Sequence, residues 1–409
     1  MTGRDPHEQG RVATGLELFY DLVFVVGFSV ATGLAGHQLA EAHFTAALVG
    51  FLICTFATIW AWINFAWFAS AFDTDDWGFR VVTLVQMIGV AIIAVGMPAV
   101  FTSVAEGGNI DNRVMILGYV VMRVGMVIQW LRAAAESEQC RRACLTYAVA
   151  IVVAQFCWVA IAIAHLPLGS TIVAMLVAGL IELMGPVIAE TRAGGTPWHA
   201  HHIAERYSLL TIITLGEGVV GVVALLSAQV AVDGWTLDTA ILGFFTMTTT
   251  FAMWWIYAAV PVGEALHARR GKCFPWGYGH IVLFMAAVGV GVGLHVAALY
   301  LEHHAEIDDQ IVAASFAVPM AVFCLGVVVM YGHLLGFDAV SVVQAGVVIV
   351  VIVASIIVCS AGASVIVALV VASLAPVAMV IVDELVGDGR RERALGALRG
   401  ARRPSVPVD

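Results

Sequence analysis

The chain has 409 residues, of which 61% are hydrophobic and only 12% are charged, and its mean hydropathy is +0.96. This composition excludes a water-soluble globular protein, in which about 25% of the residues are charged. The net charge of −10 identifies no partner, because in a membrane protein the position of each cation matters more than the sum.

Twelve apolar stretches follow one another along the chain, and each is long enough to cross the hydrocarbon core of a bilayer as a helix. They are 16–35, 44–69, 79–101, 112–133, 142–164, 169–189, 202–227, 237–260, 278–300, 311–334, 339–359 and 362–385. The sequence therefore predicts an all-α fold, a polytopic membrane helix bundle of about twelve transmembrane helices.

The basic residues predict the orientation of this bundle. With the N-terminus in the cytoplasm, all of the 19 Lys and Arg residues lie on the cytoplasmic side except Arg113 in an outer loop and Arg123 within a span. Both termini are therefore expected in the cytoplasm, residues 1–15 as a short segment and residues 386–409 as a disordered basic tail. Such a tail is expected to contact anionic lipid of the bilayer rather than nucleic acid.

Short matches between the two halves of the chain suggest an internal repeat. In the same order, ELF at 17–19 matches ERY at 205–207, WIN at 62–64 matches WIY at 255–257, and WGF at 77–79 matches WGY at 276–278. They predict two parallel six-helix repeats, 16–189 and 190–385, with the working site where the halves meet. The alternative is that these aromatic residues only mark the membrane interfaces.

Three motifs give the chain a family resemblance. The run ELFYDLVFV at 17–25, the aromatic stretch WAWINFAWF at 60–68 with the acids that follow it, and HHIAERYSLLTIITLGEGVVG at 201–221 resemble the bacterial low temperature requirement A family. The resemblance reaches to about residue 385 and implies a multi-pass protein of the inner cell membrane, linked by name to growth in the cold. The resemblance indicates the class of protein and says almost nothing about its mechanism.

The polar positions of the family motifs can be carried over one at a time. They match Glu17, Asp21, Glu205, Arg206 and Glu217 of this chain. The third motif departs from the family pattern, because glycine stands at position 218 where a small polar residue is usual.

The two acids of the first span are expected to differ in their surroundings. Glu17 should lie at the cytoplasmic interface and remain wet, whereas Asp21 lies about 6 Å deeper along the helix and needs a cation, a proton or a water-filled cavity. Both share a stripe with Phe24 and Phe28 that should face other helices. Asp21 is either a structural partner of an arginine or a group that binds a proton or cation.

Glu217 is a sharper candidate because it lies about fifteen residues into its span. Arg206 shares its helix face but stands about 16 Å away along the axis, too far for direct contact. Glu217 is expected to bind a proton or substrate; the alternative is a neutral acid that hydrogen-bonds across a helix interface.

Glu182 and Arg123 complete the set of deep charges. Pro186 follows Glu182 by four residues, which predicts a kink that could serve gating. Arg123 must find an anion or water at its depth, and Asp21, Glu182 and Glu217 are all possible partners. The arginine is either half of a structural ion pair or a group that holds a substrate anion or takes part in a switchable pair.

The functional reading rests on these charges. No catalytic motif, cofactor motif or strong metal site is found; the histidines at 199, 201 and 202 and the acidic loop 302–309 are weaker metal candidates. We expect a non-enzymatic, proton-coupled secondary transporter of an unidentified small molecule or ion. An ion or proton channel and an intramembrane enzyme acting on lipid remain alternatives, and the oligomeric state is not readable.

Overall fold

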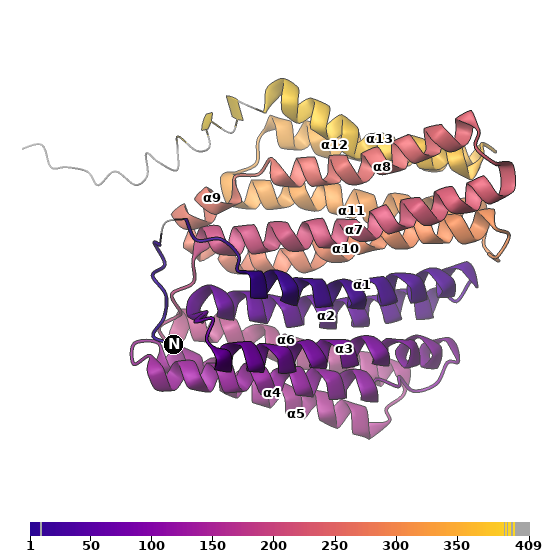
Figure 1. Ribbon diagram of the computed structural model, residues 1–409. Coiled ribbons are helices and arrows are strands. Elements are labelled where there is room, and N and C mark those ends of the chain that lie inside the picture. The colour runs from indigo at the N-terminus through magenta and orange to yellow at the C-terminus, as the bar shows by residue number, and fades with distance from the viewer. Residues whose placement is uncertain (9, 388, 391, 394–395, 397–409) are drawn as a thin grey trace, which may run out of the picture. The chain divides into compact units, whose positions relative to one another are not determined.

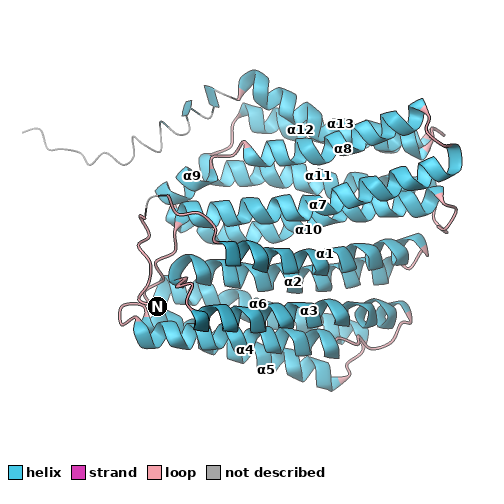
Figure 2. Ribbon diagram, in the orientation of Figure 1, coloured by secondary structure: helices cyan, strands magenta, loops and turns pink. Residues whose placement is uncertain are grey.

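The computed structural model describes residues 1–8, 10–387, 389–390, 392–393 and 396, and this part of the chain is built from helices and short connections (Figures 1 and 2). The helices are α1 (Gly15–Ala40), α2 (Phe44–Phe72), α3 (Trp77–Ala105), α4 (Arg113–Glu136), α5 (Arg141–Ala164), α6 (Leu168–Arg192), α7 (Ala200–Asp233), α8 (Leu237–Ala258), α9 (Val262–Ala268), α10 (Cys273–Leu301), α11 (Asp309–Leu335), α12 (Ala339–Ser360) and α13 (Val365–Val386).

Twelve helical segments of the described residues are long and apolar enough to cross a membrane. The short helix α9 and the 3₁₀ turn Arg270–Lys272 extend the ends of two of these spans rather than adding new ones. The predicted all-α bundle of twelve spans is therefore confirmed. Most of the predicted basic tail, namely 388, 391, 394–395 and 397–409, lies outside the described residues.

The chain forms two compact units. The first comprises residues 1–39 and 43–203 and carries α1 to α6, while the second comprises residues 40–42 and the chain from 204 onward and carries nearly all of α7 together with α8 to α13 (Figure 1). The internal duplication of six spans stays a prediction.

Close packing of α3 against α4 holds the first unit together. A Cβ added at Gly89 would lie 2.6 Å from the backbone nitrogen of Met122, and one added at Gly118 would lie 2.6 Å from the Gly89 carbonyl oxygen. Only glycine permits this approach of two backbones, which is how membrane helices gain van der Waals contact without a hydrophobic driving force between them. Aromatic rings fill the neighbouring space, with Trp130 stacked on Tyr147 at a centroid distance of 4.0 Å.

The segment before α1 packs on the end of α2. The Arg11 guanidinium donates to the carbonyl oxygens of Ser70 at 2.5 Å and Ala69 at 2.8 Å in the last turn of α2, where the Ala69 carbonyl also accepts the Asp73 backbone N–H at 3.1 Å. Burial lowers the pKa of Arg11 to about 10. The N-terminal segment thereby caps a membrane helix.

Close approach also organises the second unit around α10, the most buried of its helices. A Cβ at Gly291 would lie 2.8 Å from the Glu217 carbonyl oxygen of α7, and one at Gly293 would lie 2.5 Å from the Ser315 carbonyl oxygen of α11. The small residues of α10 therefore set the distance to both neighbours.

Asp76, between α2 and α3, joins helix capping to an ion pair. Its carboxylate accepts the Phe79 backbone N–H at 3.0 Å and two N–H groups of Arg132 at 2.9 and 2.7 Å. The hydrogen bonds from Arg132 hold the pKa of Asp76 well below its usual range. The same carboxylate thus fixes the start of α3 and ties it to the end of α4.

We expect Asp76→Ala to lower the stability of the protein by about 1–2 kcal/mol, because it removes a helix cap together with a bidentate ion pair. The measurement is the thermal unfolding midpoint of the purified protein in detergent. Asp75→Asn is the matched control, since it removes only the exposed pair with Arg80 and should cost less than about 1 kcal/mol. Equal midpoints for the two variants would contradict a capping role.

Candidate functional site

A buried ion pair joins α4 to α6 in the first unit. Arg123 NH2 lies 2.6 Å from Glu182 Oε1, and both side chains are almost fully buried, at 1% and 3% exposure. Tyr119 Oη donates to the same carboxylate oxygen at 2.7 Å and accepts from Arg123 NH2 at 2.5 Å. Trp158 of α5 donates its indole N–H to Glu182 Oε2 at 2.9 Å. Glu182 therefore has protein partners on both oxygens.

In the described part of the chain, the Arg123 guanidinium has polar partners at one nitrogen only. Within the described residues, its Nε and NH1 atoms are buried and have no hydrogen-bond partner. A guanidinium presents five N–H donors, and leaving buried donors unmatched is costly. The pairing shows that Glu182 is the acid that neutralises Arg123, and it leaves two nitrogens of the guanidinium, Nε and NH1, able to donate to a further acceptor.

Asp21 of α1 also lies inside the first unit. It is 0% exposed, and its Oδ1 accepts the indole N–H of Trp62 in α2 at 2.6 Å. Phe24 and Phe28 are fully buried as well, so the predicted inward-facing stripe of α1 is confirmed. A carboxylate at this position needs polar partners, and Trp62 supplies one.

The expectation that Glu17 stays wet is wrong. Its side chain is 0% exposed, and Oε2 accepts the Thr14 backbone N–H at 2.8 Å while lying 3.2 Å from His202 Nε2. The Thr14 hydroxyl in turn accepts the Glu17 N–H at 3.3 Å. Thr14 and Glu17 form a capping box at the start of α1, a pattern legible in the T-x-x-E spacing, and residues that precede or begin α7 cover it.

The other three motif positions lie in α7, within the second unit. Arg206 is fully buried and Glu217 is 3% exposed, whereas Glu205 is partly exposed. Glu217 lies where α7 approaches α10, and the neighbouring Gly218 approaches Thr250 of α8, to which an added Cβ would stand 3.0 Å. Glu217 therefore sits at a junction of three helices of the second unit.

Pro186 lies inside α6, which continues as a helix from Leu168 to Arg192. The ring removes the backbone hydrogen bond to the Glu182 carbonyl, as its spacing predicts. The weakened turn therefore begins at the residue that holds Arg123.

Other buried polar side chains have structural partners. Gln86 donates to Gln129 across α3 and α4 at 2.9 Å, which is the interhelical hydrogen bond expected of amides in spans. His199 Nδ1 accepts the His202 backbone N–H at 3.1 Å, so its Nε2 carries the proton and donates to the Glu8 carbonyl at 2.9 Å. Among the described residues no group of three or more His, Cys, Asp or Glu could hold a metal ion.

The indole donors are the partners that sequence reasoning missed. The sequence motifs do not include Trp158, and they include Trp62 only within the repeat match and the aromatic stretch at 60–68. A tryptophan within an apolar span usually needs an acceptor for its N–H, which makes such residues markers of buried acids nearby. Their pairing with particular carboxylates depends on helix packing.

The fold is helical, with twelve candidate spans and charged side chains buried among them. These features define a polytopic membrane protein. Residues 12–382 match the family model described as bacterial low temperature requirement A protein (LtrA). The chain belongs to this family, and the predicted resemblance is confirmed. It is also 22% identical over 294 residues to the uncharacterized protein RA0937 of Rhizobium meliloti (strain 1021), an alignment that covers 68% of this chain and 67% of the relative.

A double-mutant cycle tests the Arg123–Glu182 pair. We expect Glu182→Gln alone to destabilise the protein by about 3–5 kcal/mol, because it leaves Arg123 as an uncompensated buried charge. The double variant Arg123→Met with Glu182→Gln should recover much of that loss, measured as unfolding midpoints in detergent. Additive effects of the two changes would show that the residues do not interact.

A pH series tests the role of His199. Burial lowers the pKa of His199 below its usual 6.5, so the unfolded chain binds a proton more readily than the folded one. The stability due to the neutral ring is complete above about pH 6.5 and is lost as the pH falls through the lowered pKa. Between pH 7.5 and pH 5.5 the unfolding midpoint of the wild type should therefore fall further than that of His199→Asn, whose amide also accepts a helix N–H without titrating.

Proposed function

We propose that the protein is a secondary transporter coupled to proton movement, in which Arg123 holds an anionic group and Asp21 and Glu217 bind protons. The observation that carries the proposal is the incomplete hydrogen bonding of the Arg123 guanidinium. One of its nitrogens is held by Glu182 and Tyr119, while Nε and NH1 are buried without an acceptor among the described residues. A carboxylate or phosphate oxygen is a strong acceptor for such charged N–H donors.

The surroundings of Arg123 support a functional role for its ion pair with Glu182, beyond a purely structural one. An ion pair meant only to fix packing is expected to use both edges of the guanidinium, because each unmatched buried donor costs free energy. Displacement of the Glu182 carboxylate from NH2 would release more of the guanidinium to an incoming anion. The proline one turn later on α6 lowers the cost of moving that carboxylate.

The carboxylates support the proton coupling. Arg123 is paired with Glu182 and is therefore not the group that neutralises Asp21 or Glu217. Both of these acids are buried within spans, one in each compact unit. Reversible protonation of acids inside the membrane is a recurrent means of coupling transport to a proton gradient.

The experiment is proton flux into liposomes that contain the purified protein and an internal pH-sensitive dye. Wild type and Glu217→Gln are compared across a panel of organic anions, neutral metabolites and inorganic cations. We expect one anion to evoke a saturable pH change that falls at least about tenfold in the variant. The matched control is Glu302→Gln, which changes an exposed carboxylate in the loop after α10 and should leave the flux unaltered.

The alternatives give different results in the same assay. Proton flux without any added compound, linear in the gradient, would favour a channel. Absence of flux across the panel, together with altered lipid in membranes of cells that express the protein, would favour an intramembrane enzyme. Either result would overturn the transporter proposal.

A further inference from the structure

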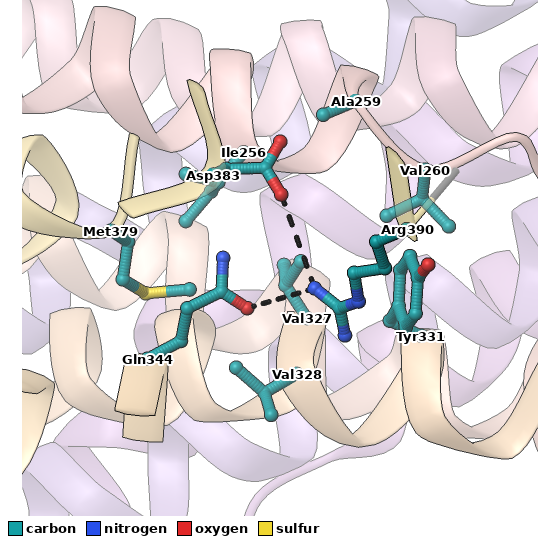
Figure 3. Close-up of a pocket in the computed structure, with 10 residues that line it drawn as sticks. All are labelled: Ile256, Ala259, Val260, Val327, Val328, Tyr331, Gln344, Met379, Asp383 and Arg390. Carbon is teal, nitrogen blue, oxygen red and sulfur yellow. Dashed lines mark hydrogen bonds and ion pairs between the residues drawn. The ribbon is translucent and has the colours of Figure 1, made fainter. Parts of the chain in front are cut away.

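A small cavity of about 20 Å³ lies within the second unit and is lined by α8, α11, α12 and α13 together with Arg390 from beyond the end of α13. Figure 3 shows the Arg390 side chain reaching between Gln344 and Asp383, with its guanidinium beside the ring of Tyr331. The side chain of Arg390 is only 4% exposed. An arginine that follows a terminal helix and carries a water-seeking charge would otherwise be expected at the surface.

Two nitrogens of this guanidinium donate hydrogen bonds, and the third lies close to a carboxylate oxygen. Nε lies 2.8 Å from Asp338 Oδ2, and NH2 donates to Ser341 Oγ at 2.7 Å. NH1 donates to Gln344 Oε1 at 3.3 Å and lies 3.9 Å from Asp383 Oδ1. The central carbon stands 3.5 Å from the centroid of the Tyr331 ring. Acceptors around the edge and an aromatic face against the plane are the surroundings that a guanidinium prefers.

The receiving groups are held by their own helices. Asp338 precedes α12, and its Oδ1 accepts both the backbone N–H and the hydroxyl of Ser341 at 2.9 Å, which leaves Oδ2 directed at Arg390. Gln344 lies one turn further along α12, while Tyr331 and Asp383 come from α11 and α13. The site is thus assembled from three rigid elements and carries two carboxylates against one cation.

The neighbouring Arg393 lies in different surroundings. Arg393 is exposed, and the bond given for its side chain is a donation to the Gly389 carbonyl oxygen at 2.7 Å. The pocket therefore receives one particular arginine of a segment that carries several. Glycines at 387 and 389 precede Arg390 and leave the chain the conformational freedom to enter or leave the pocket.

We propose that this pocket is a binding site for guanidinium-bearing ligands, and that Arg390 of the same chain occupies it as a tethered ligand. The inference is independent of the proposed transport, because it uses none of the same residues. A linked ligand acts at a high effective concentration, so a free guanidinium compound competes poorly while Arg390 is present. Removal of the Arg390 side chain exposes the vacant site.

The test uses full-length protein in detergent with ethylguanidinium as the probe. We expect Arg390→Ala to show a saturable rise of the unfolding midpoint with ethylguanidinium, because a ligand that binds only the folded state stabilises it. The wild type and Arg393→Ala should show at least about a tenfold weaker response at the same concentrations. Ethylammonium, which has the same charge but no planar fork, should bind Arg390→Ala at least about tenfold more weakly.

Two further variants locate the probe. In the Arg390→Ala background, Asp338→Asn and, separately, Tyr331→Leu should each abolish most of the ethylguanidinium response. If Arg390→Ala is not recovered as folded protein, Arg390→Gln replaces it in the same series. An Arg390 variant that responds no more than the wild type would overturn the proposal, as would an equal response to ethylammonium.

Discussion

The structure depends on the absence of water within the bilayer. A polar group that enters the hydrocarbon region must find its partner within the protein, and helices already satisfy their own backbone groups. The side chains remain to be matched, and in the first unit the match is made by a small set of contacts between helices. Glu182 takes donors from α4 and α5, and Asp21 takes one from α2. These contacts determine which helices pack together and at what rotation.

Two buried arginines show how differently the same group can be used. Arg390 donates hydrogen bonds through NH1 and NH2, its Nε lies 2.8 Å from Asp338 Oδ2, and an aromatic ring lies against its face. Arg123 stands over the Tyr119 ring at 4.7 Å and pairs with Glu182, yet two of its nitrogens lack acceptors among the described residues. The pocket around Arg390 is occupied by that side chain, whereas Arg123 keeps two nitrogens that can donate to another group. This contrast between Arg390 and Arg123 supports a functional role for Arg123.

Membership of the low temperature requirement A family identifies the class of protein but not its biochemical activity. The mechanism must therefore be argued from the site itself, since a fold hosts many functions. The first unit offers a cation, several acids and a proline-weakened helix, and the second unit contains a further deep acid, Glu217. This combination suits a reaction in which charges change partners more than one in which covalent bonds are made.

The sequence alone determined the number of spans, because hydropathy and length act locally and the bilayer fixes both. It also located the deep acids and Arg123, and the T-x-x-E spacing already contained the capping box at Glu17. It could not choose between Asp21, Glu182 and Glu217 as the partner of Arg123, nor reveal that His202 covers Glu17 or that Arg390 turns back into a pocket. These pairings join residues distant in the chain, and the rotation and close approach of whole helices decide them. Packing at glycines such as Gly89 and Gly118 sets this geometry together with the buried polar contacts.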